Sequence, residues 1–288
     1  MSRTKKSGNS FHHKKRLGQN FLRDEGVIQE IAEASEPDPD TLIIEIGPGE
    51  GVLTEALAES AGYVAAVELD DDLIPILRTR FALNDNVEII HGDILAVNLP
   101  ALIREMKDLH GLSKVRIVGN LPYYITTPII MKLLEENLDI LSITVMMQKE
   151  VADRLIAEPG TKKGSAITYA VQYRCTVEKI CDVDRTCFRP APKVDSTVLR
   201  LNLREDKPVH PDDEKLFFRC IKAGFMMRRK TLLNSLAALN SMDQNLRISR
   251  EDILRALTEI GIDPRRRAES LTMEEFAALS DAIGRNIG

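Results

Sequence analysis

Short apolar segments alternate with amphipathic ones along the first part of this chain, and this alternation restricts the possible folds more than any other feature. The apolar segments are rich in β-branched residues, which predicts strands at 42–47, 63–69, 87–93, 115–120 and 143–148. Helical patterns lie between them, for example over 51–60 and 73–83. Strands that alternate with helices form parallel βαβ units, so we predict an α/β fold with a doubly wound sheet.

The rest of the chain predicts an edge hairpin, a linker and a helical domain. Residues 177–183 and 196–203 are close enough in sequence to pair as antiparallel strands at one edge of the sheet. The polar, proline-containing segment 203–214 is typical of a linker, and only helical periodicity follows it. We therefore expect a disordered basic tail, an α/β domain and a small helical domain, over 1–15, 16–204 and 205–288.

Charge is distributed unevenly along the sequence. The net charge of −5 argues weakly against a nucleic-acid partner. Local patches matter more than the average, however, and basic clusters lie at 3–16, 227–230 and 264–267. A solvated surface explains any single cluster equally well. The candidates for RNA contacts are Lys14, Lys15, Arg16, Arg228, Arg229 and Lys230.

Several classes of protein are disfavoured by the sequence. No segment has the length and hydrophobicity of a membrane span, and the polar, basic start lacks the apolar core of a secretion signal. The cysteines form no C-x-x-C pair and have no histidine cluster nearby, so we expect free thiols and no metal site. These features predict a cytoplasmic protein without a membrane partner.

A glycine-rich turn follows the first predicted strand. Gly47, Gly49 and Gly51 separate that strand from a helix, and such a turn lets a nucleotide approach the backbone closely. Glu68 ends the second strand, where a carboxylate can accept both hydroxyls of a ribose. Asp93 ends the third strand and could accept from an adenine amine. Taken alone, Asp93 is better explained as a helix N-cap.

Acidic residues around this turn distinguish two classes of cofactor. Glu45 and Glu50 lie in or beside the turn, where they would repel the pyrophosphate of a dinucleotide. S-adenosylmethionine has no phosphate and carries a sulfonium and an ammonium group, which suit an acidic environment. The turn therefore favours a methyl donor over NAD.

A series of motifs between residues 14 and 272 resembles one family. In order they are KKRLGQNFL, EIGPGEGVLT, VELD, GNLPYYITTPI, MMQKEVADRL, FRPAPKVDSTVLRL, FMMRRKTLLNSL and GIDPRRRAESLT. They resemble the small-subunit ribosomal RNA adenine dimethyltransferases of the kasugamycin-sensitivity type. The resemblance implies a Rossmann-like class I methyltransferase domain with a seven-stranded sheet, a helical C-terminal domain, and S-adenosyl-L-methionine as cofactor.

The resemblance also implies a reaction and a set of site residues. The reaction is N6 dimethylation of two adjacent adenosines in the 3′-terminal hairpin of 16S rRNA, within a pre-30S particle during ribosome assembly. We expect the protein to be a monomer. Carried over by position, the residues of the cofactor site are Asn20, Leu22, Gly47, Gly49, Glu68, Asp93 and Asn120. The motif KKGSAITYAVQY lacks the tyrosine that commonly precedes its glycine, so the contacts of the loop around Lys162 and Lys163 are not predicted.

The stretch VGNLPYYITTP, residues 118–128, would hold the target base. The Asn120 side-chain oxygen and the Leu121 carbonyl can accept the two N–H bonds of an adenine amine and aim its lone pair at a methyl group. Pro122 would fix the turn, and Tyr123 and Phe188 would clamp the base. Phe188 alone is better explained as a core aromatic. Neighbouring side chains of an extended segment point apart, so we expect Tyr124 to pack under the loop.

Three alternatives remain at this point. A large-subunit rRNA methyltransferase of the macrolide-resistance type usually has Asn-Ile-Pro where this chain has Asn120-Leu121-Pro122. A non-catalytic ribosome assembly factor, or a transcription factor derived from the family, would not need the intact glycines and Glu68. A NAD-dependent dehydrogenase is the weakest alternative.

Overall fold

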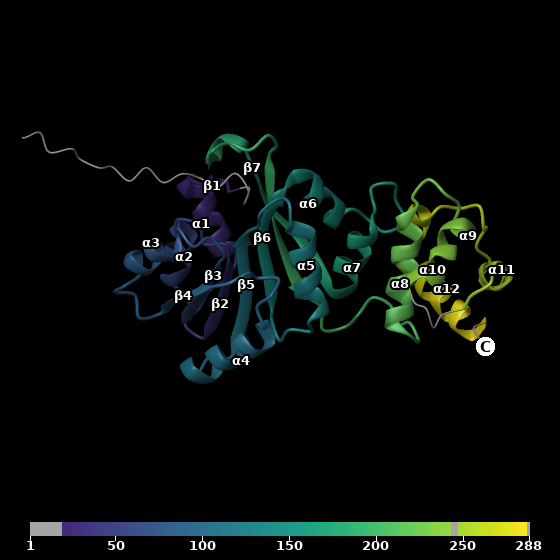
Figure 1. Ribbon diagram of the computed structural model, residues 1–288, viewed down its shortest axis with the longest axis horizontal. Helices are drawn as coiled ribbons and strands as arrows, with labels where there is room; N and C mark the ends of the chain where they lie inside the picture. Colours follow the sequence, from purple (N-terminus) through teal and green to yellow (C-terminus); the bar gives the residue numbers. More distant parts are fainter. Residues whose placement is uncertain (1–18, 243–246, 287–288) are drawn as a thin grey trace, which may run out of the picture.

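The computed structural model describes residues 19–242 and 247–286, and its larger part is built on a seven-stranded sheet (Figure 1). The strand order is β4-β3-β2-β5-β6-β9-β7. The strands are β2 (Thr41–Ile46), β3 (Tyr63–Glu68), β4 (Val87–His91), β5 (Lys114–Asn120), β6 (Ser142–Gln148), β7 (Cys175–Val183) and β9 (Ser196–Leu203). The predicted α/β class and the seven-stranded sheet are confirmed.

The pairing of the strands matches the sequence pattern closely. Strands β2 to β6 pair in parallel, and each lies within two residues of its predicted range. The predicted hairpin forms the antiparallel edge, with β9 between β6 and β7. A separate pair, β1 (Phe21–Leu22) with β8 (Phe188–Arg189), was not predicted.

Helices cover both faces of the sheet because its central strands are apolar on both sides. On β2, Leu42, Ile44 and Ile46 face one layer of helices, and Ile43 faces the other. The first layer consists of α4 (Leu99–His110), α5 (Thr126–Glu135), α6 (Lys149–Ile156) and α7 (Ala166–Arg174). The second contains α1 (Glu25–Ala34), α2 (Val52–Ala58) and α3 (Ile74–Arg80).

The described residues after Leu203 contain helices and no strand, and they form the second lobe of the molecule (Figure 1). The helices are α8 (Glu214–Met226), α9 (Leu232–Ser235), α10 (Leu239–Met242), α11 (Arg250–Glu259) and α12 (Met273–Asn286). Among the described helices, none is both long enough and apolar enough to cross a bilayer.

The core of this helical lobe includes two tyrosines from α7. The Tyr169 ring lies 5.1 Å from the Phe276 ring, and the Tyr173 ring lies 5.3 Å from the Phe217 ring. Both tyrosines are buried with these phenylalanines in one apolar cluster. Helix α7 therefore belongs to the packing of both lobes.

The predicted linker is tied to α7 rather than free. Within or beside it, Lys207 and Glu214 form an ion pair. Glu214 also accepts from the Arg174 guanidinium at 2.8 Å and from the Tyr173 hydroxyl at 3.0 Å. The N-terminal tail, including Lys14, Lys15 and Arg16, lies outside the described residues, so its predicted disorder and RNA contacts stay predictions.

A glycine lets β5 approach β2 closely just before the strands end. Gly119 is paired with Ile46 in the parallel register, and a Cβ on Gly119 would lie 2.7 Å from the Ile46 carbonyl oxygen. A side chain there would force the strands apart. The next residue, Asn120, is thereby held at the end of the sheet beside the turn that follows β2.

We predict that Gly119→Ala destabilises the protein by about 1–3 kcal/mol, because the added methyl group overpacks the β2–β5 contact. Denaturant unfolding measures the change. Gly284→Ala is the control: Gly284 lies in α12 and its nearest contact would be 3.6 Å away, so alanine should be neutral or stabilise by up to ~1 kcal/mol. Equal stability of the two variants would contradict the proposed close contact.

Candidate active site

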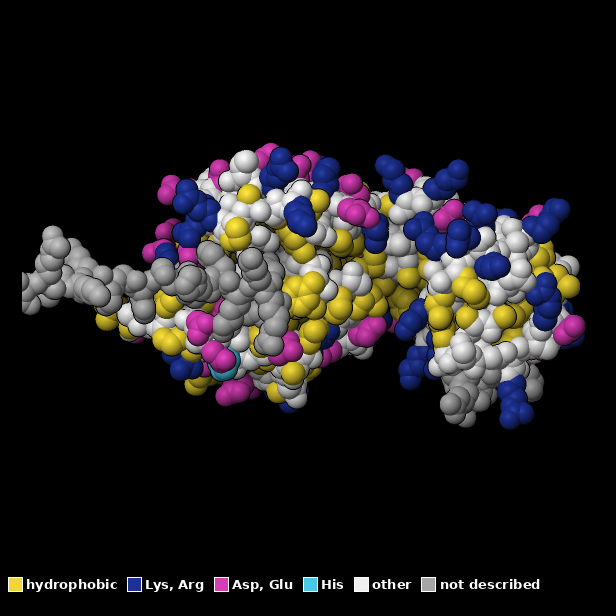
Figure 2. Space-filling model, turned by 45° about the horizontal axis from the view of Figure 1, so that its top comes forward, with side chains coloured by type: hydrophobic (Ala, Val, Ile, Leu, Met, Phe, Trp, Pro, Cys, Tyr) yellow, Lys and Arg dark blue, Asp and Glu magenta, His cyan; other side chains and the backbone are white. Residues whose placement is uncertain are grey.

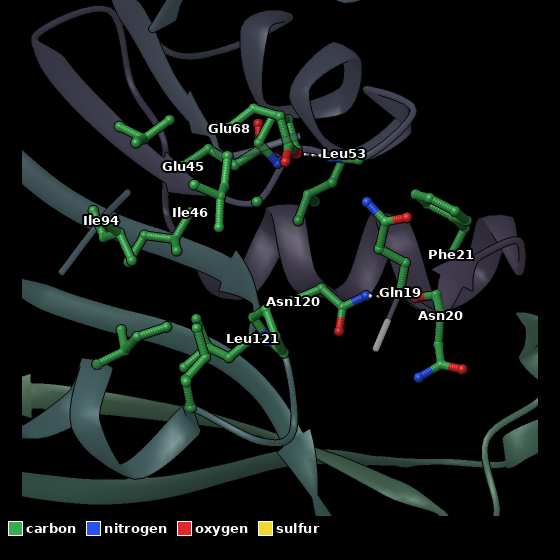
Figure 3. Close-up of a pocket in the computed structure, with 18 of the residues that line it drawn as sticks. Gln19, Asn20, Phe21, Glu45, Ile46, Leu53, Glu68, Ile94, Asn120 and Leu121 are labelled. Atoms are coloured by element: carbon green, nitrogen blue, oxygen red, sulfur yellow. Dashed lines mark hydrogen bonds between the residues drawn. The ribbon is translucent and has the colours of Figure 1, made fainter. Parts of the chain in front are cut away.

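A cavity opens where the carboxyl ends of four parallel strands meet (Figure 3). Strands β2 and β5 are adjacent, but the chain continues from β2 to β3 on one side and reaches β5 on the other. Such a reversal leaves a crevice at the strand ends, where α/β proteins bind ligands. The cavity is lined from β2, β3 and β5 and from the turn after β4.

The glycine-rich turn forms one wall of this cavity. Gly49 and Gly51 have φ angles of +60° and +84°, a conformation that favours glycine. A Cβ on Gly49 would lie 3.0 Å from the Phe21 ring, which packs against the turn. Gly47 lines the same wall and has a φ of +71°. The turn thus exposes backbone to the cavity, as the spacing predicts.

Glu68 lies at the end of β3 with its carboxylate fixed by the backbone. Its Oε2 accepts the N–H of Gly49 at 3.2 Å, and its Oε1 accepts the N–H of Asp70 at 2.8 Å. Burial raises the pKa of Glu68 in spite of these bonds. Each carboxylate oxygen has capacity for a second donor, so Glu68 can still accept hydroxyl groups from a ligand.

Glu45 provides a second buried carboxyl group in the cavity. It is 1% exposed and accepts a hydrogen bond from the Thr54 hydroxyl at 2.6 Å. Burial, together with the charge of Glu68, raises the pKa of Glu45 to about 7. Glu50 differs, because its carboxylate lies 2.5 Å from the Arg23 guanidinium. The acidic character of the cavity therefore comes from Glu45, Glu68 and Asp93, and it favours a cationic ligand over a phosphate.

Asp93 lines the cavity from the turn after β4. Its carboxylate accepts the N–H of Leu95 at 2.9 Å. The alternative explanation of Asp93 as a helix N-cap is wrong, because α4 begins only at Leu99 and is capped by Asn98. An aspartate bonded two residues ahead makes a turn that needs no helix.

The Asn120 side chain is oriented by the segment that leads into β1. Its amide nitrogen donates to the Asn20 backbone carbonyl at 3.2 Å (Figure 3). A carbonyl cannot donate, so the amide nitrogen must face Asn20 and the Asn120 oxygen must face away. Among the described residues, no donor reaches that oxygen. The Leu121 N–H donates to the Met146 carbonyl at 3.1 Å, which fixes the backbone beside it.

The two tyrosines after Pro122 both line the cavity. The Tyr123 hydroxyl is hydrogen-bonded to the Ser196 hydroxyl at 2.6 Å, and burial raises the pKa of Tyr123. Tyr124 is 55% exposed, so the prediction that it packs under the loop is wrong. The chain turns into α5 directly after these residues and does not continue as the extended segment that this prediction assumed.

Phe188 does not lie where its predicted role as a base clamp would place it. It is 2% exposed, is paired with Leu22 in the small β1–β8 sheet, and belongs to the apolar cluster around α1 and α2. It is not among the residues that line the cavity. In this structure Phe188 is a core aromatic packed beside Leu22 and does not face the cavity, where the predicted clamp would need it.

The structure brings most of the predicted site residues together. Those that line the cavity are Asn20, Leu22, Gly47, Gly49, Glu68, Asp93, Asn120, Leu121, Pro122 and Tyr123. Two further residues line the cavity and were not predicted, Gln19 and Phe21. The Gln19 amide donates to the Asp70 carboxylate at 2.7 Å. The place of Gln19 and Phe21 beside Asn20 in the GQNFL motif was the available signal.

The cavity holds acidic and amide groups but no metal-binding arrangement. Over the part of the chain that the structure describes, no group of three or more His, Cys, Asp or Glu side chains could hold a metal ion. The cysteines are free. The residues that line the cavity offer carboxylate, amide, phenol and backbone groups.

Comparison with known proteins identifies the family. A family model described as "Ribosomal RNA adenine dimethylase" matches residues 10–281. This chain belongs to the ribosomal RNA adenine dimethylase family. A relative from Geobacillus thermodenitrificans named "Ribosomal RNA small subunit methyltransferase A" is 51% identical, over 95% of this chain and 92% of its own length. A relative of the same name from Clostridium acetobutylicum is 48% identical, over 96% of this chain and 95% of its own length.

Solved structures agree with this assignment to the dimethylase family. A dimethyladenosine transferase from Plasmodium falciparum has a TM-score of 0.74 at 25% identity, covering 90% of this chain and 95% of its own. The 23S rRNA methyltransferase ErmE has a TM-score of 0.68 at 28% identity, and the match covers 92% of this chain and 100% of the ErmE chain. Both coverages extend well beyond the sheet, so the helical lobe is part of the family architecture.

We predict that Glu45→Gln changes how the stability of this dimethylase depends on pH. A pKa raised to about 7 means that the folded state holds a proton that the unfolded chain releases above about 4.5. The associated stability is present at low pH and is lost as pH rises through about 7, an effect on the order of 3 kcal/mol. Glutamine cannot ionise and can still accept from Thr54. Its advantage over the parent in denaturant unfolding should grow from pH 5 to pH 8, and parallel curves would refute this.

Proposed function

We propose that this enzyme transfers methyl groups from S-adenosyl-L-methionine to the N6 amines of two adjacent adenosines in the 3′-terminal hairpin of 16S rRNA. Membership of the adenine dimethylase family supports the reaction, and the names of the relatives support the small-subunit substrate. The observation that carries the proposal is the Asn120 side chain, whose oxygen is oriented as an acceptor beside an acidic cavity. The proposed setting is a cytoplasmic pre-30S particle, with the enzyme as a monomer.

The residues of the cavity fit the proposed cofactor. When bound, S-adenosylmethionine supplies an electrophilic methyl group on a cationic sulfur. Glu68 would accept the ribose hydroxyls, and Asp93 would accept from the adenine amine. The buried carboxyl groups of Glu45 and Glu68 have raised pKa values, and a cation in the cavity would relieve the cost of their ionisation. Gly47, Gly49, Asn20 and Leu22 would complete the walls.

The chain's own groups would act on the adenine amine by positioning it. The lone pair of this nitrogen is delocalised into the ring, which makes it a weak nucleophile. Hydrogen bonds from its two N–H groups to the Asn120 oxygen and the Leu121 carbonyl would favour a pyramidal nitrogen and direct its lone pair. These acceptors also stabilise the positive charge that develops on the nitrogen. No strong base is needed, because the amine becomes acidic only after methylation.

We predict that Asn120→Ala lowers the methylation rate by about 100-fold or more, with a smaller effect on cofactor affinity. Asn120→Asp is a second, matched variant, because its carboxylate cannot donate to the Asn20 carbonyl. It should therefore also lose most activity, although it keeps an oxygen acceptor. Single-turnover rates and calorimetric cofactor titrations separate the two effects. A parental rate in Asn120→Ala would remove Asn120 from the mechanism, and a parental rate in Asn120→Asp would show that the bond to Asn20 is not required.

Tyr123 should act through its ring face. Stacking of a base on an aromatic ring contributes about 1–3 kcal/mol, so Tyr123→Ala should lose about tenfold or more in rate. Tyr123→Phe removes only the bond to Ser196 and should retain most of the rate. Ser196→Ala removes the same bond from the other side and serves as the control. If Tyr123→Phe were as inactive as Tyr123→Ala while Ser196→Ala stayed active, the phenol oxygen would be required and stacking would be the wrong role.

The substrate is tested by incubating the enzyme with labelled S-adenosylmethionine and, in separate reactions, with undermethylated small subunits or large-subunit RNA, followed by primer extension. Dimethylation removes both N–H donors from the Watson–Crick edge of adenine, so reverse transcriptase should stop at the modified pair. Label in large-subunit RNA without these stops would support the macrolide-resistance alternative. No label in either RNA, with rRNA still bound, would support a non-catalytic assembly factor.

A further inference from the structure

The arginines of the two C-terminal basic clusters are not equivalent. Arg228, in the cluster 227–230, donates to the backbone carbonyls of Lys162 and Gly164 at 3.0 and 3.3 Å. It also donates to the Glu269 carboxylate at 3.0 Å. All three bonds come from one guanidinium nitrogen, Nη2, which thereby joins acceptors from both lobes, while the side chain remains exposed. The sequence predicts an RNA contact for Arg228, and the structure adds these contacts within the protein.

In the cluster 264–267, some arginines bind groups of the protein and others face solvent. Arg266 is half-buried and forms a two-pronged pair with Glu275 at 2.5 and 2.8 Å. Arg265 pairs with Asp263 at 2.9 Å. Arg267 is exposed, and among the described residues it has no ion pair. Each cluster thus contains cations that hold the fold and cations that face solvent.

The loop 157–165 of the sheet lobe is attached to the helical lobe at a second point. The Gly160 N–H donates to the Tyr169 hydroxyl at 3.0 Å, and that hydroxyl donates to the Leu271 carbonyl. Arg228 and Tyr169 therefore fix the loop from two directions. Lys162 and Lys163 project from this fixed loop and are exposed.

Exposed cations gather where the loop meets the helical lobe. In the described chain, five of them have no ion pair: Lys162, Lys163, Arg229, Lys230 and Arg267. Figure 2 shows Lys and Arg side chains concentrated on the helical lobe and beside its junction with the sheet lobe. Glu158 is the exposed acid of the loop, and Glu269 is already paired with Arg228. The net charge of this surface is positive.

We propose that Arg228 is a positioning residue, which holds the loop 157–165 so that Lys162 and Lys163 form one phosphate-binding surface with Arg229 and Lys230. The surface spans both lobes and fits the backbone of the rRNA, so this inference rests on the proposed function. The Nη2 that makes these contacts lies one bond further along the side chain than the Nζ of a lysine, so a lysine at this position would keep the charge but not reach all three acceptors. Geometry rather than charge is what arginine supplies at position 228.

The test compares Arg228→Lys with Arg229→Lys, because both keep the charge. Hydrogen exchange of amides 160–165 in the protein without RNA should accelerate in Arg228→Lys only. Affinity for a 16S rRNA fragment should fall by about tenfold in Arg228→Lys, as expected for losing hydrogen bonds to a charged group, and by less than about twofold in Arg229→Lys. Equal behaviour of the two variants in both measurements would overturn the inference.

A second measurement separates positioning from direct phosphate contact. Replacing Lys162 and Lys163 together by glutamine should weaken rRNA binding and reduce its salt dependence in the parent. The same replacement should have a much smaller effect in Arg228→Lys, because the loop is already misplaced. Fully additive effects would show that Arg228 contacts phosphate independently. If the parent protein did not bind rRNA, both the proposed function and the phosphate-binding surface would be wrong. If Arg228→Lys bound rRNA as tightly as the parent, only the positioning role of Arg228 would be wrong.

Discussion

The close approach of β5 to β2 at Gly119 is the contact on which the rest of the site depends. The glycine-rich turn leaves the sheet from β2, and Asn120 leaves it from β5 one residue after the contact. Glu68 is attached to the same frame, because β3 pairs with β2 on its other side. Three adjacent strands therefore hold the ligand-facing groups at fixed separations, because each group is attached directly to the end of a paired strand.

The cavity combines this rigid frame with an electrostatic arrangement that is unfavourable for folding. Glu45 and Glu68 are buried near each other, and burial raises the pKa of each. Backbone N–H groups and the Thr54 hydroxyl offset part of the cost. A cationic ligand in the cavity would offset this cost, so the electrostatics of the site suit the proposed cofactor.

The sequence predicted the features that depend on local pattern. The β-branched runs, the spacing of Gly47 to Glu68 and the position of Asn120 after a strand were sufficient to place the cavity. The two-residue strands β1 and β8 are too short to show periodicity, and their pairing joins distant segments. The burial of Phe188 follows from that pairing, so it could not be read from the residues around it.

The contacts of Arg228 within the protein could not be predicted for a related reason. A run of basic residues suggests an electrostatic surface, and the side chains of Arg228, Arg229 and Lys230 are all exposed as such a surface requires. The acceptors of Arg228 are mostly backbone carbonyls of a loop more than 60 residues earlier. Backbone groups carry no sequence signature, so the difference between neighbouring arginines is visible only in the fold.

The position of α7 between the two cores has a consequence for how the lobes can be recombined. Tyr169 and Tyr173 belong to the core of the helical lobe, whereas Val171, on the same helix, belongs to the core of the sheet lobe. A chimera joined at 203–214 would separate the helical core from two of its rings. One joined before α7 would remove Val171 from the sheet. Neither junction keeps both cores intact, so an exchange of one lobe would require α7 to be repacked against the other.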